Sequence, residues 1–295
     1  MRAVFCEKLT LVGVGLLGGS LGLAVRRQGL AGRVEGYVRR TASVAECERA
    51  GAVDRATTDL AEAVRDADFI VVCTPLAQMR ELVGRALPAI KRGAVLTDVG
   101  SVKHGLVEDF ARLAKRAGAH YVGSNPMAGA EKSGVAHARA DLFTDAVCVI
   151  TPTRTSSPLA VGRVRRFWRG VGGRVVELAP SQHDRLVSRS SHLPHVVAVT
   201  LVNQVLRPGR AEAEGALCAN GFRDSTRIAS GSPEMWRDIV LANRVQLSRS
   251  LREFMTELGA FVAAIRAQDA DKVSGYFERA KAWRDAWVGG TEARE

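Results

Sequence analysis

Residues 8–25, KLTLVGVGLLGGSLGLAV, decide the fold of this chain. An apolar run leads into Gly13-x-Gly15-x-x-Gly18, and a segment of small residues follows at once. In a dinucleotide-binding βαβ unit the first glycine permits a tight turn, the second admits the pyrophosphate, and the third lets the helix pack on the strand. The next apolar run that such a unit needs, RVEGYV, arrives at residues 33–38. We therefore predict a dinucleotide site at this turn, formed by Gly13, Gly15, Leu16, Leu17 and Gly18.

The alternation of strands and helices continues to about residue 180. Further strands are expected at residues 67–75, 94–101, 146–152 and 173–180, with a helix at 77–90. Thr74 and Pro75 end the strand 67–75, at the carboxyl edge of the sheet, where ligands bind in doubly wound folds. The predicted fold class is α/β, with a Rossmann-type doubly wound parallel sheet over residues 1–180.

After Pro180 the pattern becomes helical. Residues 181–206 and 221–265 carry apolar side chains at helical spacing, and Ser232-Pro233-Glu234 is typical of a helix start. We expect an all-α C-terminal domain over residues 181–295 that binds substrate. A helical bundle appended to a Rossmann domain commonly packs against its twin, so this domain is also expected to form a homodimer.

The residues after the second strand indicate the cofactor. An NAD-preferring site places Asp or Glu there, to bind the ribose 2′-hydroxyl. Here the position is Val38, followed by Arg39, Arg40 and Thr41. Two guanidinium groups and a hydroxyl suit a 2′-phosphate, so the sequence predicts NADP. NAD is the alternative, because Glu35 lies nearby and both arginines could be solvated loop residues.

Composition excludes several classes of protein. With 46% hydrophobic and 25% charged residues, the chain has the composition of a soluble globular protein. No apolar run approaches the roughly 18–20 residues of a membrane span, and the N-terminus lacks a signal-peptide pattern, so we expect a cytoplasmic protein. The five cysteines show no metal-binding spacing, and no metal is expected. The net charge of +11 comes mostly from scattered arginines with few aromatics, which argues against a nucleic-acid partner.

Four short stretches carry the candidate chemistry. They are GSVK at 100–103, NPMAGAEKSG at 125–134, SHLPH at 191–195 and GFRDSTRIASGSPEMWRDI at 221–239. Residues 123–134, GSNPMAGAEKSG, which contain the second stretch, are too small to fill a core and too polar for a strand, which is typical of a wall that lines a ligand. Taken together, in this order and spacing, the four stretches resemble the prephenate/arogenate dehydrogenase family, and the resemblance covers almost the whole chain.

The resemblance implies oxidative decarboxylation of a cyclohexadiene dicarboxylate. In that family hydride leaves ring C4 for a nicotinamide, the ring carboxylate departs as CO2, and aromatisation drives the step. Ser101 would then orient the C4 substituent, and His195 would line the pocket beside His192 and Glu131. Arg227 would grip a substrate carboxylate, and Trp236 resembles a residue that reaches a neighbouring active site across the dimer.

Each of these residues also has a structural alternative. Ser101 could be a helix N-cap, and the two histidines could be satisfied helix residues. Arg227 could pair with Asp224 or Asp238, and Trp236 could belong to the core. Glu131 could lie in a solvated turn.

Position 125 departs from the family pattern. Family members usually have histidine before the Pro-Met-Ala-Gly sequence, where it accepts or hydrogen-bonds the C4 hydroxyl proton. Here the residue is Asn125, whose amide cannot act as a general base near neutral pH. A C4 amino group needs no base, because its nitrogen lone pair can expel the hydride. The sequence therefore favours 4-amino-4-deoxyprephenate as substrate and 4-aminophenylpyruvate as product.

Three other functions stay open. The first is an ordinary prephenate or arogenate dehydrogenase of tyrosine biosynthesis with a relocated base. The second is a 3-hydroxyacid dehydrogenase, which is disfavoured because residues 181–206 contain no lysine. The third is an inactive NADP-binding sensor, against which the retention of His195 and Arg227 argues.

Overall fold

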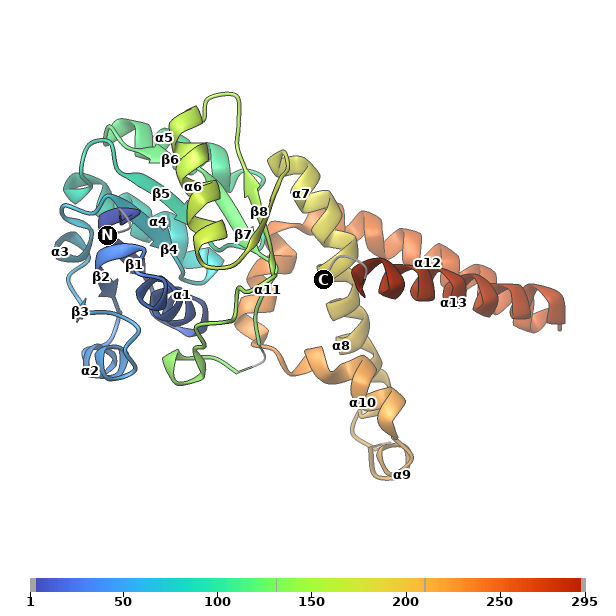
Figure 1. Cartoon of the computed structure of the whole chain (residues 1–295). Helices are drawn as coiled ribbons and strands as arrows, with labels where there is room; N and C mark the ends of the chain where they lie inside the picture. Colours follow the sequence, from blue (N-terminus) through green and yellow to red (C-terminus); the bar gives the residue numbers. More distant parts are fainter. Residues whose placement is uncertain (1–3, 131, 210, 293–295) are drawn as a thin grey trace. The chain divides into compact units, whose positions relative to one another are not determined.

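A parallel sheet of six strands forms the centre of the N-terminal part. The computed structural model describes residues 4–130, 132–209 and 211–292. The strand order is β3-β2-β1-β4-β5-β6, and every neighbouring pair is parallel (Figure 1). The strands are β1 (Cys6–Val12), β2 (Ala31–Tyr37), β3 (Arg55–Thr57), β4 (Phe69–Val72), β5 (Val95–Asp98) and β6 (His120–Tyr121). The order reverses between β1 and β4, and this switch point is where a doubly wound sheet opens a ligand crevice at its carboxyl edge.

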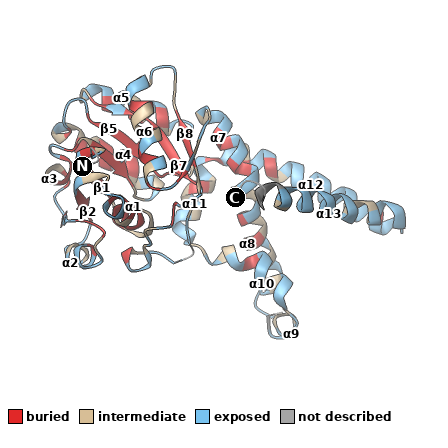
Figure 2. Ribbon diagram, in the orientation of Figure 1, coloured by how far each residue is buried: buried red, intermediate tan, exposed pale blue. Residues whose placement is uncertain are grey.

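Helices cover both faces of this sheet. They are α1 (Leu16–Arg27), α2 (Ala42–Arg49), α3 (Leu60–Val64), α4 (Leu76–Ala86), α5 (Leu106–Arg116) and α6 (Pro158–Gly170). One buried cluster joins α1, α2 and α6 to strand residues such as Phe69 and Val71. The other joins α3, α4 and α5 to the alternate residues Ile70 and Val72. Successive strand residues point to opposite faces, so a strand buried on both sides, such as β4, is apolar throughout. Figure 2 shows that the central sheet is largely buried.

The stretch 123–126 forms a strand, so the expectation that it is too polar for one is wrong. β7 (Gly123–Pro126) pairs antiparallel with β8 (Val147–Thr151), which pairs parallel with β9 (Arg174–Glu177). The polar residues are tolerated because they are satisfied within the fold. The Ser124 hydroxyl bonds Thr97 Oγ1 at 2.7 Å and donates to the Asp98 carbonyl, and the Ser124 amide donates to Asp98 Oδ1 at 3.0 Å. The predicted strands at 146–152 and 173–180 therefore belong to a second, smaller sheet.

The helical part follows β9, and the prediction of an α/β fold with an all-α C-terminal part is confirmed. Its helices are α7 (Pro180–Val187), α8 (Leu193–Val205), α9 (Ala211–Ala216), α10 (Asn220–Thr226), α11 (Pro233–Ala242), α12 (Arg244–Arg266) and α13 (Ala270–Glu292). Ser232 caps α11 as expected, with its Oγ accepting from the Met235 amide at 3.3 Å. A π-helical turn, Ser188–His192, joins α7 to α8, and a 3₁₀ turn, Arg227–Ser230, joins α10 to α11.

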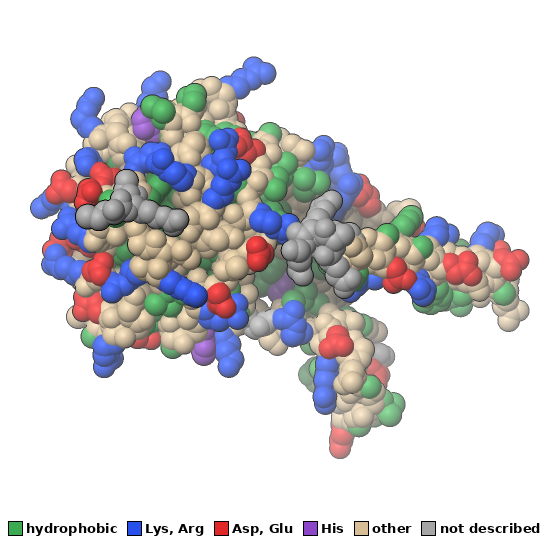
Figure 3. Space-filling model, viewed as in Figure 1, with side chains coloured by type: hydrophobic (Ala, Val, Ile, Leu, Met, Phe, Trp, Pro, Cys, Tyr) green, Lys and Arg blue, Asp and Glu red, His purple; other side chains and the backbone are tan. Residues whose placement is uncertain are grey.

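The chain separates into two compact units by its contacts. The first ends at Arg244 and holds both sheets with α1 to α11, and the second begins at Val245 and holds α13 with nearly all of α12. The domain boundary expected near residue 180 stays a prediction. Among the described residues, no helix is long and apolar enough to cross a membrane. Lysine and arginine side chains are spread over the visible face among acidic ones rather than gathered in a stripe (Figure 3).

Candidate active site

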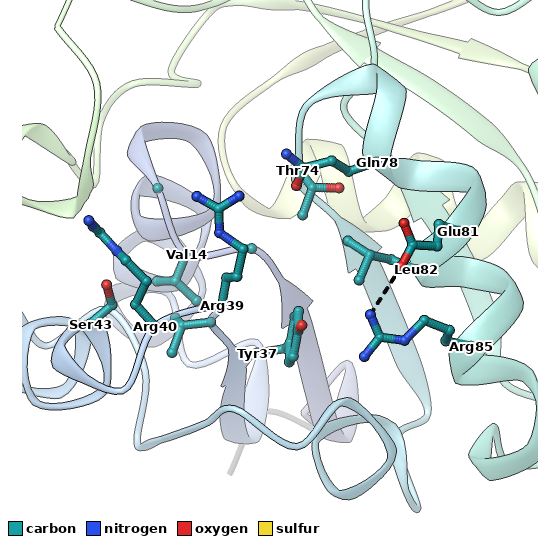
Figure 4. A pocket seen from close by; sticks show the side chains of 13 residues that line it. Val14, Tyr37, Arg39, Arg40, Ser43, Thr74, Gln78, Glu81, Leu82 and Arg85 are labelled. Carbon is teal, nitrogen blue, oxygen red and sulfur yellow. Dashed lines mark hydrogen bonds and ion pairs between the residues drawn. The ribbon is translucent and has the colours of Figure 1, made fainter.

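The glycine turn lines a pocket at the carboxyl edge of the parallel sheet. Its volume is about 490 Å³, and the residues around it come from the ends of β1, β2 and β4 and from α4. From the glycine turn and β4 it takes Gly13, Gly15 and Thr74. From the end of β2 it takes Tyr37, Val38, Arg39 and Arg40, with Ser43 on α2 and Gln78, Glu81 and Arg85 on α4 (Figure 4).

This pocket has the features that a dinucleotide needs. Gly13 has φ +98°, and a Cβ there would lie 2.8 Å from Thr74 Cγ2, so only glycine fits. A Cβ at Gly18 would lie 2.0 Å from the Gly13 carbonyl oxygen, whereas one at Gly15 would meet nothing within 4 Å, so the turn stays open toward a ligand. Thr74 Oγ1 is buried and has no hydrogen-bond partner, which leaves it available to a bound group. The residues present therefore fit a nicotinamide dinucleotide.

The pocket is basic at the end of β2, where the adenosine ribose of a dinucleotide binds in this type of fold. Arg39 and Arg40 extend from the end of β2, and Ser43 lies beside Arg40 (Figure 4). Glu35, the carboxylate that could have favoured NAD, lies within β2 opposite Thr10 and is bound by Lys8 at 2.6 Å. Of the predicted residues, Leu16, Leu17, Gly18, Thr41 and Pro75 are not among the described residues lining the pocket, and sequence reasoning missed Ser43.

A second pocket brings the four candidate stretches together. Its volume is about 400 Å³, and it opens beside the end of β5, between β7 and the helical part of the first unit. Six predicted residues line it: Ser101, Asn125, His192, His195, Arg227 and Trp236. Glu131 lies outside the described residues. Ser191, Met127 and Met235 also line it; they lie within the candidate stretches, but the sequence analysis gave them no individual role.

Buried Asp98 holds the floor of this pocket in place. Its carboxylate accepts from the Tyr121 hydroxyl at 2.7 Å and from the Gly100 amide at 2.9 Å, and it pairs with the Lys103 ammonium. Lys103 is 0% exposed, and burial lowers the pKa of its ammonium while the Asp98 carboxylate opposes that shift. Because Asp98 also binds Ser124, it fixes the backbone that carries Asn125.

Ser101 is not a helix cap, since α5 begins at Leu106 after Gly105, which has φ +80°. The amides of Lys103 and His104 instead donate to the two carboxylate oxygens of Asp184 on α7, at 2.8 and 2.7 Å. These bonds tie the loop after β5 to the helical part. Ser101 is thereby held at the pocket wall.

Asn125 is 5% exposed, and its amide nitrogen is bound on the protein side. Nδ2 lies 3.0 Å from His183 Nε2 and donates to Met127 Sδ at 3.6 Å. His183 Nδ1 lies 2.7 Å from Asp184 Oδ1. The sequence analysis gave no role to His183 or Asp184. The sequence of a His-Asp pair on a helix does not show which strand the pair will contact.

Asn243 sets the tautomer of His192. Asn243 Nδ2 donates to the Asp184 carbonyl at 2.9 Å and lies 3.2 Å from His192 Nδ1, so Nδ1 is the acceptor and Nε2 carries the proton. Burial lowers the pKa of His192 to about 4, against the opposing effect of the Asp184 carboxylate. The π-helical turn ends at His192. Such turns are frequent at functional sites.

His195 stacks on Trp236 of the same chain. Their ring centroids are 3.4 Å apart, and burial lowers the pKa of His195 to about 4. The expectation that Trp236 reaches a neighbouring active site stays a prediction. Asp238 is bound by Arg237 at 2.8 Å, and Arg227 lines the pocket from the 3₁₀ turn.

Comparison with known proteins adds a family to this geometry. A profile described as "Prephenate dehydrogenase, nucleotide-binding domain" matches residues 21–177, and one described as "Prephenate dehydrogenase, dimerization domain" matches residues 179–279. The chain is 33% identical to the prephenate dehydrogenase of Bacillus subtilis over 281 residues, which is 95% of this chain and 76% of that protein. It is 30% identical over 206 residues to the 4-amino-4-deoxyprephenate dehydrogenase of Streptomyces pristinaespiralis, across 66% of this chain and 63% of that one.

A solved structure agrees with the sequence matches. The crystal structure of prephenate dehydrogenase from Aquifex aeolicus with hydroxyphenyl propionate and NAD+ superposes with a TM-score of 0.88 at 31% identity. The match covers 95% of this chain and 98% of that one. With the glycine turn, the pocket beyond β5 and both family profiles in agreement, this chain belongs to the prephenate dehydrogenase family of nicotinamide-dependent, decarboxylating dehydrogenases.

Proposed function

We propose that this protein oxidatively decarboxylates 4-amino-4-deoxyprephenate to 4-aminophenylpyruvate, with NADP as cofactor. The observation that carries the proposal is Asn125, which lines the pocket where the family usually has a histidine. Its Nδ2 is bound to His183 and Met127, so its carbonyl oxygen Oδ1 is the polar group it can offer to a ligand. A neutral acceptor suits an N–H donor at ring C4.

The chemistry at C4 explains why an asparagine is sufficient. Bound NADP would accept the C4 hydride. The nitrogen lone pair of a C4 amine stabilises the cation left behind as an iminium, and loss of CO2 returns two electrons to the ring as the aniline forms. From the neutral amine no proton has to leave, so Asn125 need only orient an N–H bond. A C4 hydroxyl is a weaker electron donor and profits from a base, which typically contributes about 10²–10⁴ in rate.

The remaining walls supply orientation and charge. Ser101 and His192 Nε2–H would donate hydrogen bonds to the ring substituents, and Arg227 would bind a substrate carboxylate. His195 and Trp236 present flat apolar surface against which a ring can lie. Neutral histidines avoid placing further positive charge beside the developing cation.

The preference for NADP is supported by the end of β2. Arg39, Arg40 and Ser43 lie together there, and Glu81, the acidic residue among the described pocket-lining side chains, is bound by Arg85 at 3.3 Å (Figure 4). A 2′-phosphate would meet two guanidinium groups and no free carboxylate from these residues. The protein would act in the cytoplasm. It would form a homodimer through its helical domain, and the match to the dimerization-domain profile supports this assembly.

An ordinary prephenate or arogenate dehydrogenase is the second candidate. The similarity to Bacillus subtilis prephenate dehydrogenase favours it, since that relative matches over more of its length than the aminodeoxyprephenate enzyme does. In this case the C4 hydroxyl proton would have to reach Ser101 or water, because Asn125 cannot take it.

A substrate panel tests both functions. Cofactor reduction is followed at about 340 nm with prephenate, arogenate and 4-amino-4-deoxyprephenate, with NADP and with NAD, for the natural protein and Asn125→His. We expect kcat/KM for the amino compound to exceed that for prephenate by at least about 10²-fold, and Asn125→His to reverse much of that preference. Comparable turnover of prephenate by the natural protein would exclude the amino assignment, and no reduction with any compound would favour a sensor.

A further inference from the structure

We propose that His183 and Asp184 are positioning residues that fix which end of the Asn125 amide faces the substrate. The inference rests on the proposed function for the identity of the C4 group, but its geometry belongs to this chain alone. His183 lies behind Asn125, 0% exposed, and does not line the pocket itself. It therefore acts on a substrate only through the asparagine.

The Asn125 amide has two alternative orientations, with opposite chemistry. With Nδ2 toward His183, the carbonyl oxygen faces the pocket and accepts hydrogen bonds. With the amide turned over, the NH₂ group faces the pocket and donates them. A C4 amino or hydroxyl group that donates would gain a partner in the first orientation and lose it in the second.

The tautomer of His183 selects the first orientation. Nδ1 lies 2.7 Å from Asp184 Oδ1, and a carboxylate can only accept, so Nδ1 carries the proton. In the neutral ring Nε2 is then a bare acceptor, 3.0 Å from Asn125 Nδ2. The other Nδ2 hydrogen is directed to Met127 Sδ. Turning the amide would place a carbonyl oxygen against a ring nitrogen with no hydrogen between them.

Asp184 is itself fixed and cannot change role. It accepts from the amides of Lys103 and His104 and is 2% exposed, so three donors hold its two oxygens in one position. The order of hydrogen bonds from the loop after β5 through Asp184 and His183 to Asn125 is therefore set before substrate arrives.

Three variants distinguish a role in orienting the Asn125 amide from a role in the stability of the fold. His183→Gln keeps an acceptor oxygen at the reach of Nε2, whereas His183→Leu removes the acceptor at similar volume. His183→Phe also removes the acceptor but keeps a planar ring behind Asn125. Thermal unfolding and NADP affinity identify the variants that remain folded.

The measurement is a ratio of affinities in the NADP-saturated protein. Calorimetry compares 4-aminophenylpyruvate with phenylpyruvate, which lacks the para substituent. One hydrogen bond from the para group predicts that the natural protein binds the amino compound about two- to tenfold more tightly. We expect His183→Gln to keep this ratio, and His183→Leu and His183→Phe to bring it to one or below.

Two outcomes would overturn the inference. One is a folded His183→Leu or His183→Phe protein that keeps the natural ratio, and the other is a His183→Gln protein that loses it. If His183→Leu does not fold, His183→Phe and His183→Gln still decide. Repeating the comparison with 4-hydroxyphenylpyruvate, another para donor, keeps the test valid if prephenate proves to be the substrate, so the two proposals fail separately.

Discussion

The imidazole of His195 and the indole of Trp236 lie nearly parallel, with an interplanar angle of 16° and ring centroids 3.4 Å apart. Gly231 closes the turn beside them, where a Cβ would lie 2.8 Å from Trp236 Nε1 and 3.3 Å from His195 Cε1. The stack joins α8 to α11 and gives the pocket a flat wall made from residues 41 positions apart in sequence.

Replacing Trp236 should weaken substrate binding. Trp236→Ala removes the face that covers His195, and we expect KM for the substrate to rise about tenfold while KM for NADP changes less than about twofold, since loss of one aromatic pair costs about 1 kcal/mol beyond its buried area. Trp236→Phe keeps an aromatic ring and is the matched control. Steady-state kinetics for both variants check this, and an unchanged KM in Trp236→Ala would contradict the assignment of the stack to the substrate wall.

The stability of the protein should fall as pH falls from about 6.5 to 4. The pKa values of His192 and His195 are lowered to about 4 in the fold, against 6.5 when unfolded, so the unfolded chain binds more protons in this window. Each histidine contributes a slope of at most about 1.4 kcal/mol per pH unit there, and none above pH 7. Urea unfolding between pH 7 and 5 measures the slope. His195→Gln should reduce it, and an identical slope in that variant would show that His195 does not titrate as expected.

Removing both arginines at the end of β2 should change cofactor preference. Arg39→Ala/Arg40→Ala loses two charge-assisted contacts to a 2′-phosphate, so we expect the Kd for NADP to rise about 10- to 100-fold and that for NAD to change little. Arg27→Ala/Arg49→Ala removes two exposed positive charges from α1 and α2 outside the pocket and controls for net charge. Fluorescence titration with both cofactors measures the Kd values, and equal losses for NADP and NAD would refute a 2′-phosphate site.

Breaking the buried pair below the pocket should destabilise the fold strongly. Lys103→Met leaves the Asp98 carboxylate buried without its cation, which typically costs about 3–5 kcal/mol. Lys91→Met breaks a more exposed pair with Asp68 and should cost less than about 1 kcal/mol. Urea unfolding compares the two, and Asp98→Asn/Lys103→Met should recover part of the loss because no unpaired charge remains. Equal effects of the two single changes would contradict the buried pair.

Local sequence patterns predicted many of the helices and strands. The glycine turn, the apolar runs and the Ser232-Pro233 helix start each act within a few residues, and each appears where expected. The strand at Gly123–Pro126 and the start of α5 were not foreseen, since both depend on partners far away in sequence. Ser124 is satisfied by Asp98 and Thr97, and the amides before α5 by Asp184 on α7.

The sequence by itself determined the nucleotide-binding fold, the helical C-terminal part, the family resemblance and the unusual asparagine at position 125. These follow from residue spacing and from the identity of single side chains. Only the tertiary structure decided that Asn125 lies 3.0 Å from His183, that Asn243 sets the tautomer of His192, and that His195 stacks on Trp236. Asn125 and His183 are 58 residues apart in the sequence, and His192 and Asn243 are 51 residues apart. The residue pattern of the chain does not show which of these distant side chains will be in contact.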